Sequence, residues 1–134
     1  PHTLAEKGEK YFQAPSGLPL VQHALLMLLE HVHDGTLPLE LIVEKTSHRV
    51  ADLFAIKDRG YIREGYFADL VLVDHLKPTT VRREDVLSKC GWSPFEGTTF
   101  RSSIDTTVVN GIVAYENGKV TEAIAGQRLD CAGR

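Results

Sequence analysis

Histidines are the residues of this sequence best suited to metal or acid–base chemistry, and two of them have a suggestive spacing. His31 and His33 stand two residues apart, as metal ligands at the end of a strand often do. The apolar pattern around them predicts a helix, however, and on a helix such positions point roughly 200° apart. Histidines in the last turn of a helix are also favoured by its dipole. We therefore expect this pair to be structural.

The remaining helical and loop histidines offer no better catalytic set. His23 and His48 should be surface or packing residues on helices, and His75 follows a strand end, where we expect it to be solvated. The sequence has no Gly-rich phosphate loop, and its carboxylates show no pairing that would favour general acid–base catalysis. These residues alone do not make a complete catalytic site.

His2 has a different setting, because a turn-forming segment follows it. The loop that carries this imidazole runs to the turn Ala14-Pro15-Ser16-Gly17. The imidazole and the exposed backbone N–H groups of Ser16 and Gly17 could together hold a small anion. On the residues alone, a terminal segment without a role is an equally good interpretation.

The first half of the chain should be helical once this loop ends. Residues 1–17 show no hydrophobic periodicity, which predicts a loop. From Leu18, apolar residues at helical spacing predict a buried helix over residues 18–33. It should end at Asp34-Gly35, because Gly35 can adopt the left-handed C-cap conformation.

Two shorter helices should follow. Pro38 suits the start of the first, from Leu39 to about Lys45. The second should begin at an N-cap, either Thr46 or Ser47. Its inward-facing residues are expected to be Val50, Leu53 and Phe54.

After Lys57 the sequence is rich in β-formers, and Asn110-Gly111 and Asn117-Gly118 are typical of tight turns. Helices without strands to pack on, and strands with open edges around Ala68–Asp74 and Thr99–Asn110, indicate that both halves need partners. We therefore expect part of a longer polypeptide, consistent with a first residue that is not Met, and a homo-oligomer. The expected strands are Tyr61–Arg63, Ala68–Asp74, Thr99–Asn110, Ile112–Tyr115 and Lys119–Ile124, with a single helical turn within Val81–Ser88.

The composition is that of an ordinary soluble globular protein, with 134 residues, 25% of them charged and 43% hydrophobic, and a net charge of −3. We expect a cytoplasmic location. Scattered acids and bases argue against a nucleic-acid partner. The longest apolar run, Ala24–Leu29, is far too short to cross a membrane, and no signal-peptide pattern is present. Cys90 and Cys131 lie far apart; a disulfide stays open, but two free thiols in a reducing cytosol are favoured.

A set of motifs runs in order along nearly the whole chain. The motifs are Pro1-His2-Thr3 with Glu6-Lys7, the turn Ala14–Gly17, the segment Gly60–Asp74, the loop Trp92–Gly97 and the hairpin Val108–Gly118. Together they resemble the C-terminal portion of the dihydroorotases, cyclic amidohydrolases of the amidohydrolase superfamily. The strand Ala68–Val71 (Ala-Asp-Leu-Val) is typical of amidohydrolases in general, whereas Pro-His-Thr with Ser-Pro-Phe-Glu-Gly is typical of dihydroorotases. The Val50-Ala51 pair departs from the family's Pro-Ala, which affects packing rather than chemistry.

This resemblance implies an α/β fold, the C-terminal fragment of a (β/α)8 TIM-barrel amidohydrolase with its share of a composite β-sandwich. Residues 1–57 would be the end of the barrel, with the substrate loop and outer helices, and residues 58–134 the C-terminal part of the sandwich. In such barrels the chemistry lies on loops at the C-terminal ends of the strands, where residues 1–17 would fall.

The resemblance also implies zinc-dependent, reversible hydrolysis of dihydroorotate to N-carbamoyl-L-aspartate in pyrimidine biosynthesis. One or two zinc ions would activate a hydroxide, and an Asp would shuttle the proton. That Asp would lie two positions before Pro1, with the metal ligands further upstream, so this chain alone would be inactive and hold no metal. Its own part would be substrate binding: His2 would contact the substrate carboxylate, and Ser16 and Gly17 would meet the substrate through their backbone.

Three alternatives stay open. A hydantoinase or dihydropyrimidinase would share fold and chemistry. Its substrate ring has no carboxylate, however, so His2 in the Pro-His-Thr motif would have no negative charge to contact. A catalytically inactive dihydroorotase-like subunit would differ only in residues upstream of Pro1. A free-standing β-rich binding module is the third, and the apolar helix at residues 18–33 argues against it.

Overall fold

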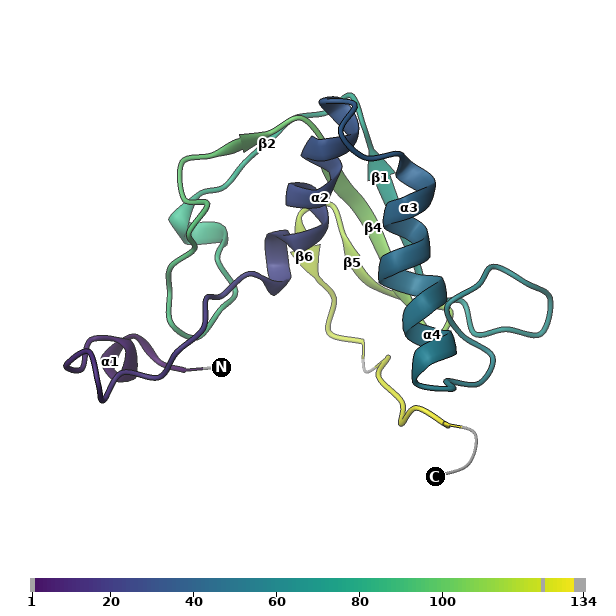
Figure 1. Cartoon of the computed structure of the whole chain (residues 1–134), viewed down its shortest axis with the longest axis horizontal. Coiled ribbons are helices and arrows are strands. Elements are labelled where there is room, and N and C mark those ends of the chain that lie inside the picture. Colours follow the sequence, from purple (N-terminus) through teal and green to yellow (C-terminus); the bar gives the residue numbers. More distant parts are fainter. Residues whose placement is uncertain (1, 124, 132–134) are drawn as a thin grey trace.

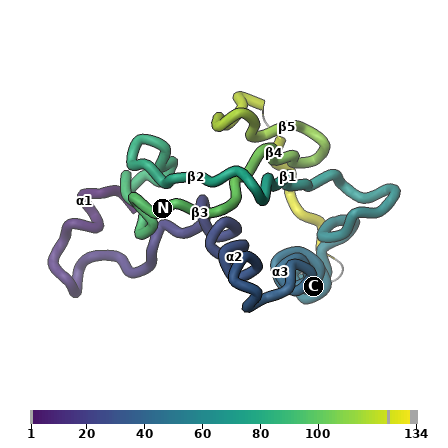
Figure 2. Tube along the Cα trace, turned by 90° about the horizontal axis from the view of Figure 1, so that it is seen from above, coloured from purple at the N-terminus to yellow at the C-terminus, as the bar shows by residue number. Residues whose placement is uncertain are grey.

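A group of helices and a small antiparallel sheet form the two layers of this mixed α/β chain (Figure 1). The structure is a computed structural model that describes residues 2–123 and 125–131. Its helices are α1 (Leu4–Lys7), a 3-10 turn (Val21–His23), α2 (Ala24–His33), α3 (Leu39–Val43), a π-helical turn (Glu44–His48), α4 (Arg49–Leu53) and a second 3-10 turn (Arg83–Asp85). Its strands are β1 (Leu70–Asp74), β2 (Thr79–Thr80), β3 (Thr99–Phe100), β4 (Ser103–Val109), β5 (Ile112–Glu116) and β6 (Lys119–Val120). Figure 2 shows α2 and α3 on the same side of β1, β4 and β5.

Helix α1 lies in the segment for which the sequence predicted only a loop. The backbone N–H and hydroxyl of Thr3 donate to the Glu6 carboxylate (2.6 and 2.8 Å), and the Glu6 N–H donates back to Thr3 Oγ1 (3.3 Å). This reciprocal capping box satisfies the first N–H groups of one helical turn. The prediction was wrong because it relied on apolar periodicity, which a four-residue exposed helix does not need.

Helix α2 begins later than predicted and ends where predicted. Val21 is 95% exposed and belongs to the 3-10 turn, so the apolar residues before Ala24 do not join the inner face of the helix. Leu26 and Leu29 are the buried residues of that face. Gly35 follows the last turn with a φ of 69°, which confirms the expected left-handed stop.

The predicted second and third helices form one continuous helical run. It begins after Pro38, as predicted, but Thr46 caps no new helix: its hydroxyl donates to the Ile42 carbonyl (2.8 Å) inside a π-helical turn. A π turn takes up about one extra residue and therefore rotates the faces that follow it. Ala51 is buried as a result, whereas the residues predicted to face inward are exposed, namely Val50, Leu53 and Phe54.

The main sheet is antiparallel, with the strand order β1-β4-β5-β6, and β2 pairs separately with β3. Asn110 and Gly111 have φ values of 52° and 79°, and Asn117 and Gly118 have 53° and 80°, which confirms both predicted hairpin turns. The open edge expected on residues 99–110 is wrong for β4, which is paired on both sides. The edges of the sheet are β1 and β6.

The strand predicted at Tyr61–Arg63 does not form; Tyr61 lies at a bend, and the next two residues are irregular. The Tyr61 ring stacks on His48 (4.3 Å between centroids, 6° between planes), and its hydroxyl donates to the Asp52 carboxylate at 3.0 Å. These contacts hold the segment against the helical run instead of in a sheet. The last predicted strand, Lys119–Ile124, ends at Val120, and Ile124 lies outside the described residues.

The hydrophobic core joins α2 to the β-rich half. Leu26 packs with Val81 and Phe100, and the partly buried neighbours of this cluster are Met27, Phe95 and Ile104. Beside it, the Arg101 guanidinium and backbone N–H both donate to the Glu30 carboxylate (2.8 and 2.7 Å). The expectation that the helices lack strands to pack on is therefore wrong for α2.

Arg59, which is only 8% exposed, connects segments that are far apart in the sequence. Its guanidinium pairs with the Asp69 carboxylate, donates to the side-chain oxygen of Asn110 and lies 4.0 Å over the centre of the Phe67 ring. The Asn110 amide nitrogen in turn donates to the Ala125 carbonyl. This Arg59 network ties residues 59–69, the β4–β5 turn and the C-terminal segment together.

Both cysteines are free thiols, Cys90 buried and Cys131 exposed, as the sequence favoured. Across residues 2–123 and 125–131, no helix has the length and apolar character needed to cross a bilayer.

Candidate functional site

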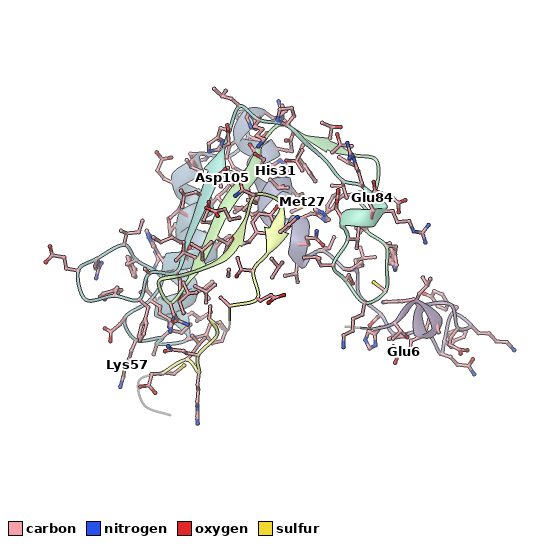
Figure 3. All side chains as sticks on the ribbon, turned by 180° about the vertical axis from the view of Figure 1, so that it is seen from behind. Glu6, Met27, His31, Lys57, Glu84 and Asp105 are labelled. Carbon is pink, nitrogen blue, oxygen red and sulfur yellow. The ribbon has the colours of Figure 1, made fainter. Side chains whose placement is uncertain are left out.

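The candidate site lies on residues 2–17, which extend away from the sheet at one end of the molecule (Figure 1). Glu6 in this segment and Lys57 lie at opposite ends of the molecule (Figure 3). His2 lines a hollow of about 360 Å³. The other residues around it are Ala5, Glu6, Glu9, Gln13 and Pro15. The structure thus places His2 beside Pro15, the residue before Ser16 and Gly17, which themselves do not line the hollow.

The capping box of α1 fixes the backbone next to His2. The hydrogen bond from the Thr3 backbone N–H lowers the pKa of the Glu6 carboxyl, and the Thr3 hydroxyl and the charge of nearby His2 add to this lowering. Glu6 is therefore ionised around neutral pH, and its charge is directed at Thr3. The result is a short, rigid connection between His2 and the body of α1.

Lys7 ties α1 to the turn that contains Ser16 and Gly17. Its ammonium nitrogen donates to the backbone carbonyls of Pro15 (2.6 Å), Ser16 (3.1 Å) and Gly17 (2.6 Å). Gly17 has a φ of 92°, a conformation that favours glycine. We call this three-carbonyl contact the Lys7 clamp.

The other side of the same turn presents backbone donors. Within the described residues, the N–H groups of Ser16 and Gly17 make no intramolecular hydrogen bond. Unpaired N–H groups of this kind attract anions. The three residues expected from the sequence, His2, Ser16 and Gly17, therefore lie on one small unit that Thr3, Glu6 and Lys7 hold together.

Sequence reasoning missed the contribution of Lys7. Its side chain contacts residues that lie 8 to 10 positions further along the chain, and local sequence patterns do not predict contacts at that separation. The signal that could have indicated the arrangement is Thr3-x-x-Glu6, a capping-box signature that predicts α1 and places Lys7 in its last turn.

Apart from the exposed His31, the other histidines pack against neighbouring elements. His23 is buried and shares a hydrogen bond with Ser93 (Nδ1 to Oγ, 3.3 Å), and burial lowers the pKa of its imidazole. His33 shares one with the fully buried Ser102 (Nε2 to Oγ, 2.8 Å). His75, expected to be solvated, is half-buried, with its ring 5.8 Å from that of His33.

The described residues do not fit a zinc centre. Across residues 2–123 and 125–131, no three side chains of His, Cys, Asp or Glu come close enough together to hold a metal ion. A catalytic zinc site requires about three protein ligands around an open position.

A second, larger hollow of about 850 Å³ lies between α2, the Arg83–Asp85 turn and the main sheet. Its lining includes His23, Glu84, Asp85, Lys119 and Tyr115. It contains none of the residues predicted as a site.

Comparison with known proteins gives one family match and a consistent set of relatives. Residues 16–113 match the model described as "Amidohydrolase family". A dihydroorotase of Halobacterium salinarum is 43% identical over 97 residues, 72% of this chain and 23% of the relative. A dihydroorotase of Pyrococcus abyssi is 35% identical over 129 residues, 96% of this chain and 31% of the relative. An allantoinase of Desulfitobacterium hafniense is 36% identical over 124 residues, 92% of this chain and 28% of the relative.

Solved structures agree with this set. A D-hydantoinase (dihydropyrimidinase) from Thermus sp. matches with a TM-score of 0.81 and 25% identity, over 90% of this chain and 28% of that chain. An L-hydantoinase (dihydropyrimidinase) from Arthrobacter aurescens matches with a TM-score of 0.75 and 31% identity, over 82% and 25% respectively. The chain spans less than a third of the length of these relatives.

Proposed function

The chain belongs to the amidohydrolase family, and on this premise we propose that it is the substrate-binding, C-terminal part of a dihydroorotase. The similarity to dihydroorotases of Halobacterium salinarum and Pyrococcus abyssi supports this proposal. In it, residues 1–57 form the end of a (β/α)8 barrel and residues 58–134 the C-terminal part of a β-sandwich. The zinc ligands and the proton-shuttling Asp would belong to the part of the relatives that this chain does not match.

One observation carries the proposal: His2 and the Ser16-Gly17 turn lie on a single braced unit, with a hollow beside His2 and unpaired N–H groups on the turn. An imidazole and backbone N–H groups are donors suited to a carboxylate. Dihydroorotate and N-carbamoyl-aspartate both carry a carboxylate that is unchanged by the reaction and can serve to hold the molecule in place. The role proposed for this unit is to hold that group while the ring amide bond is hydrolysed or closed elsewhere in the site.

A hydantoinase-type or allantoinase-type enzyme is the second candidate, and one feature of the hollow favours it. Glu6 and Glu9 lie on its lining, and their negative charges would weaken the binding of a carboxylate. A ring without a carboxylate would not experience this repulsion. The similarity to an allantoinase and to hydantoinase structures is compatible with this candidate.

The two candidates differ in what His2→Ala should do in the full-length polypeptide that carries this sequence. If His2 binds the carboxylate, kcat/KM for dihydroorotate should fall roughly tenfold to a hundredfold, because a hydrogen bond to a charged group contributes about 1.5–3 kcal/mol. Zinc content should not change. His31→Ala is the matched control, since His31 is an exposed histidine on α2 at a distance from this hollow.

Several outcomes would contradict the proposal. Turnover of hydantoin or allantoin by the wild type, without turnover of dihydroorotate, would favour the second candidate. Loss of zinc in His2→Ala would make His2 a metal ligand. An unmodified full-length protein that binds dihydroorotate but turns over none of these rings would be a catalytically inactive subunit.

A further inference from the structure

We infer that Lys7 is a positioning residue: it turns the backbone N–H groups of Ser16, Gly17 and Leu18 toward a bound carboxylate, an inference that rests on the proposed function. Lys7 itself would not touch the substrate. It would act through the peptide groups of the turn that it holds.

The geometry of the peptide bond links the Lys7 clamp to the donors. In a trans peptide unit, the carbonyl of one residue and the N–H of the next point in opposite directions. The carbonyls of Pro15, Ser16 and Gly17 all converge on the Lys7 ammonium. The N–H groups of the same three peptide units, which belong to Ser16, Gly17 and Leu18, must therefore point away from Lys7.

These three N–H groups are available to a ligand. In the part of the chain that the structure describes, none of them donates to another protein group. Three successive peptide units with their donors on one side and their acceptors on the other form a concave anion site of the kind that backbone amides build. Without Lys7, the three carbonyls would repel one another and the peptide units would be free to rotate toward solvent.

Charge strengthens the same arrangement. The ammonium neutralises the carbonyl side of the turn, so an anion that approaches the N–H side meets a positive charge behind the peptide units instead of uncompensated carbonyl oxygens. Ordering a lysine side chain costs conformational entropy, and three hydrogen bonds, two of them 2.6 Å long, offset this cost.

The clamp also sets the turn relative to His2. Lys7 is the last residue of α1, and the Thr3–Glu6 capping box at the other end of that helix adjoins His2. One helical turn therefore separates the proposed imidazole donor from the group that holds the backbone donors. Glu6 and Lys7 therefore connect the two halves of the proposed carboxylate site through α1.

The test compares Lys7→Met and Lys7→Arg with the wild type in the full-length polypeptide. Lys7→Met should raise KM for dihydroorotate about tenfold or more, because donors to a charged group lose their alignment. The change in kcat should be smaller, since the carboxylate is held in the ground state and the transition state alike. Lys7→Arg, whose guanidinium can still donate to the carbonyls, should recover part of the loss.

Lys10→Met is the matched control, because Lys10 lies in the same loop, is exposed, and has a side chain without a hydrogen bond or ion pair to any described residue. It should leave KM unchanged. A Lys7→Met enzyme with the KM of the wild type, or one in which kcat collapses at unchanged KM, would overturn the inference.

A second readout separates this inference from the proposed function. With selective 15N labelling, the amide resonances of Ser16, Gly17 and Leu18 should shift when dihydroorotate is added to the wild type, and should shift far less in Lys7→Met. If the wild type neither binds nor turns over dihydroorotate, the proposed function fails, and the carboxylate role of Lys7 fails with it. If dihydroorotate binds but these amides do not respond, only the positioning role is overturned.

Discussion

At the scale of single residues, Gly60 is the position at which a side chain has the least room. It has a φ of 79°, and a Cβ placed there would lie 2.5 Å from the Ala51 Cβ and 3.0 Å from the Ser47 carbonyl oxygen. Gly60→Ala should therefore destabilise the fold by about 2–5 kcal/mol, from the left-handed backbone and the overpacking together. Urea unfolding followed by circular dichroism measures this loss.

Gly65 supplies the comparison for that measurement. Its φ is 81°, yet a Cβ placed there meets no atom within 4 Å. Gly65→Ala should cost only the backbone part, about 1–2 kcal/mol. Equal losses for the two variants would mean that the close approach to Ala51 contributes nothing.

At the scale of elements, the docking of α2 on the β3–β4 corner depends on a carboxylate. Burial opposes ionisation of Glu30, but hydrogen bonds from the Arg101 backbone and side chain outweigh it and hold the pKa of Glu30 below its ordinary value of 4.5. The folded state therefore binds this proton more weakly than the unfolded state does. The stabilisation is complete above pH 4.5 and is lost as the pH falls through the lower pKa of the folded protein.

Glu30→Gln tests this contribution. At about pH 7 the variant should be less stable than the wild type by on the order of 1 kcal/mol, as for a partly exposed ion pair, and the difference should shrink as the pH falls below 4.5. Urea unfolding across this pH range measures the difference in the free energy of unfolding. Glu64→Gln is the control, because Glu64 is an exposed loop residue. A stability difference that stays constant with pH would rule out the proton linkage.

The elements that the sequence predicted well are those whose cause is local. The turns at Asn110-Gly111 and Asn117-Gly118 and the stop at Gly35 each follow from one or two residues that tolerate positive φ. The π-helical turn and the bent Tyr61–Arg63 segment depend on contacts with other elements, such as the stack of Tyr61 on His48. Secondary-structure propensity describes local preferences and therefore cannot predict such contacts between elements.

The candidate site divides in the same way. His2, Ser16 and Gly17 followed from resemblance to a family, and the residues alone left an idle terminus equally open. The Lys7 clamp could not be predicted, because three backbone carbonyls carry no side-chain signature in a sequence.

At the scale of the whole molecule, the outer edge of β1 should make the 134-residue chain self-associate. Within the described residues β1 pairs only with β4, and its Val71 and Leu72 are 47% and 48% exposed. An unpaired, apolar strand edge favours pairing with a second copy. This replaces the earlier expectation for residues 99–110, since β4 is covered on both sides.

Val71→Lys should shift the chain toward the mass of a single copy in sedimentation velocity, because a lysine on an edge strand opposes strand addition. Leu76→Lys removes an apolar side chain that is 92% exposed and lies outside the strands, and should change the mass little. A wild-type chain that stays monomeric at high concentration would refute self-association through this edge.

The Arg59 network has a consequence for how this sequence can evolve. Loss of Asp69 would leave the buried Arg59 charge without its carboxylate partner, which typically costs about 3–5 kcal/mol, whereas replacing a buried ion pair by apolar residues of similar volume is often neutral. We therefore expect the three positions to co-vary: relatives should either keep Arg59, Asp69 and Asn110 together or have replaced all of them. Because the Arg59 network unites three distant stretches of chain, recombination between diverged relatives within residues 59–110 should produce unstable hybrids more often than crossovers before residue 59.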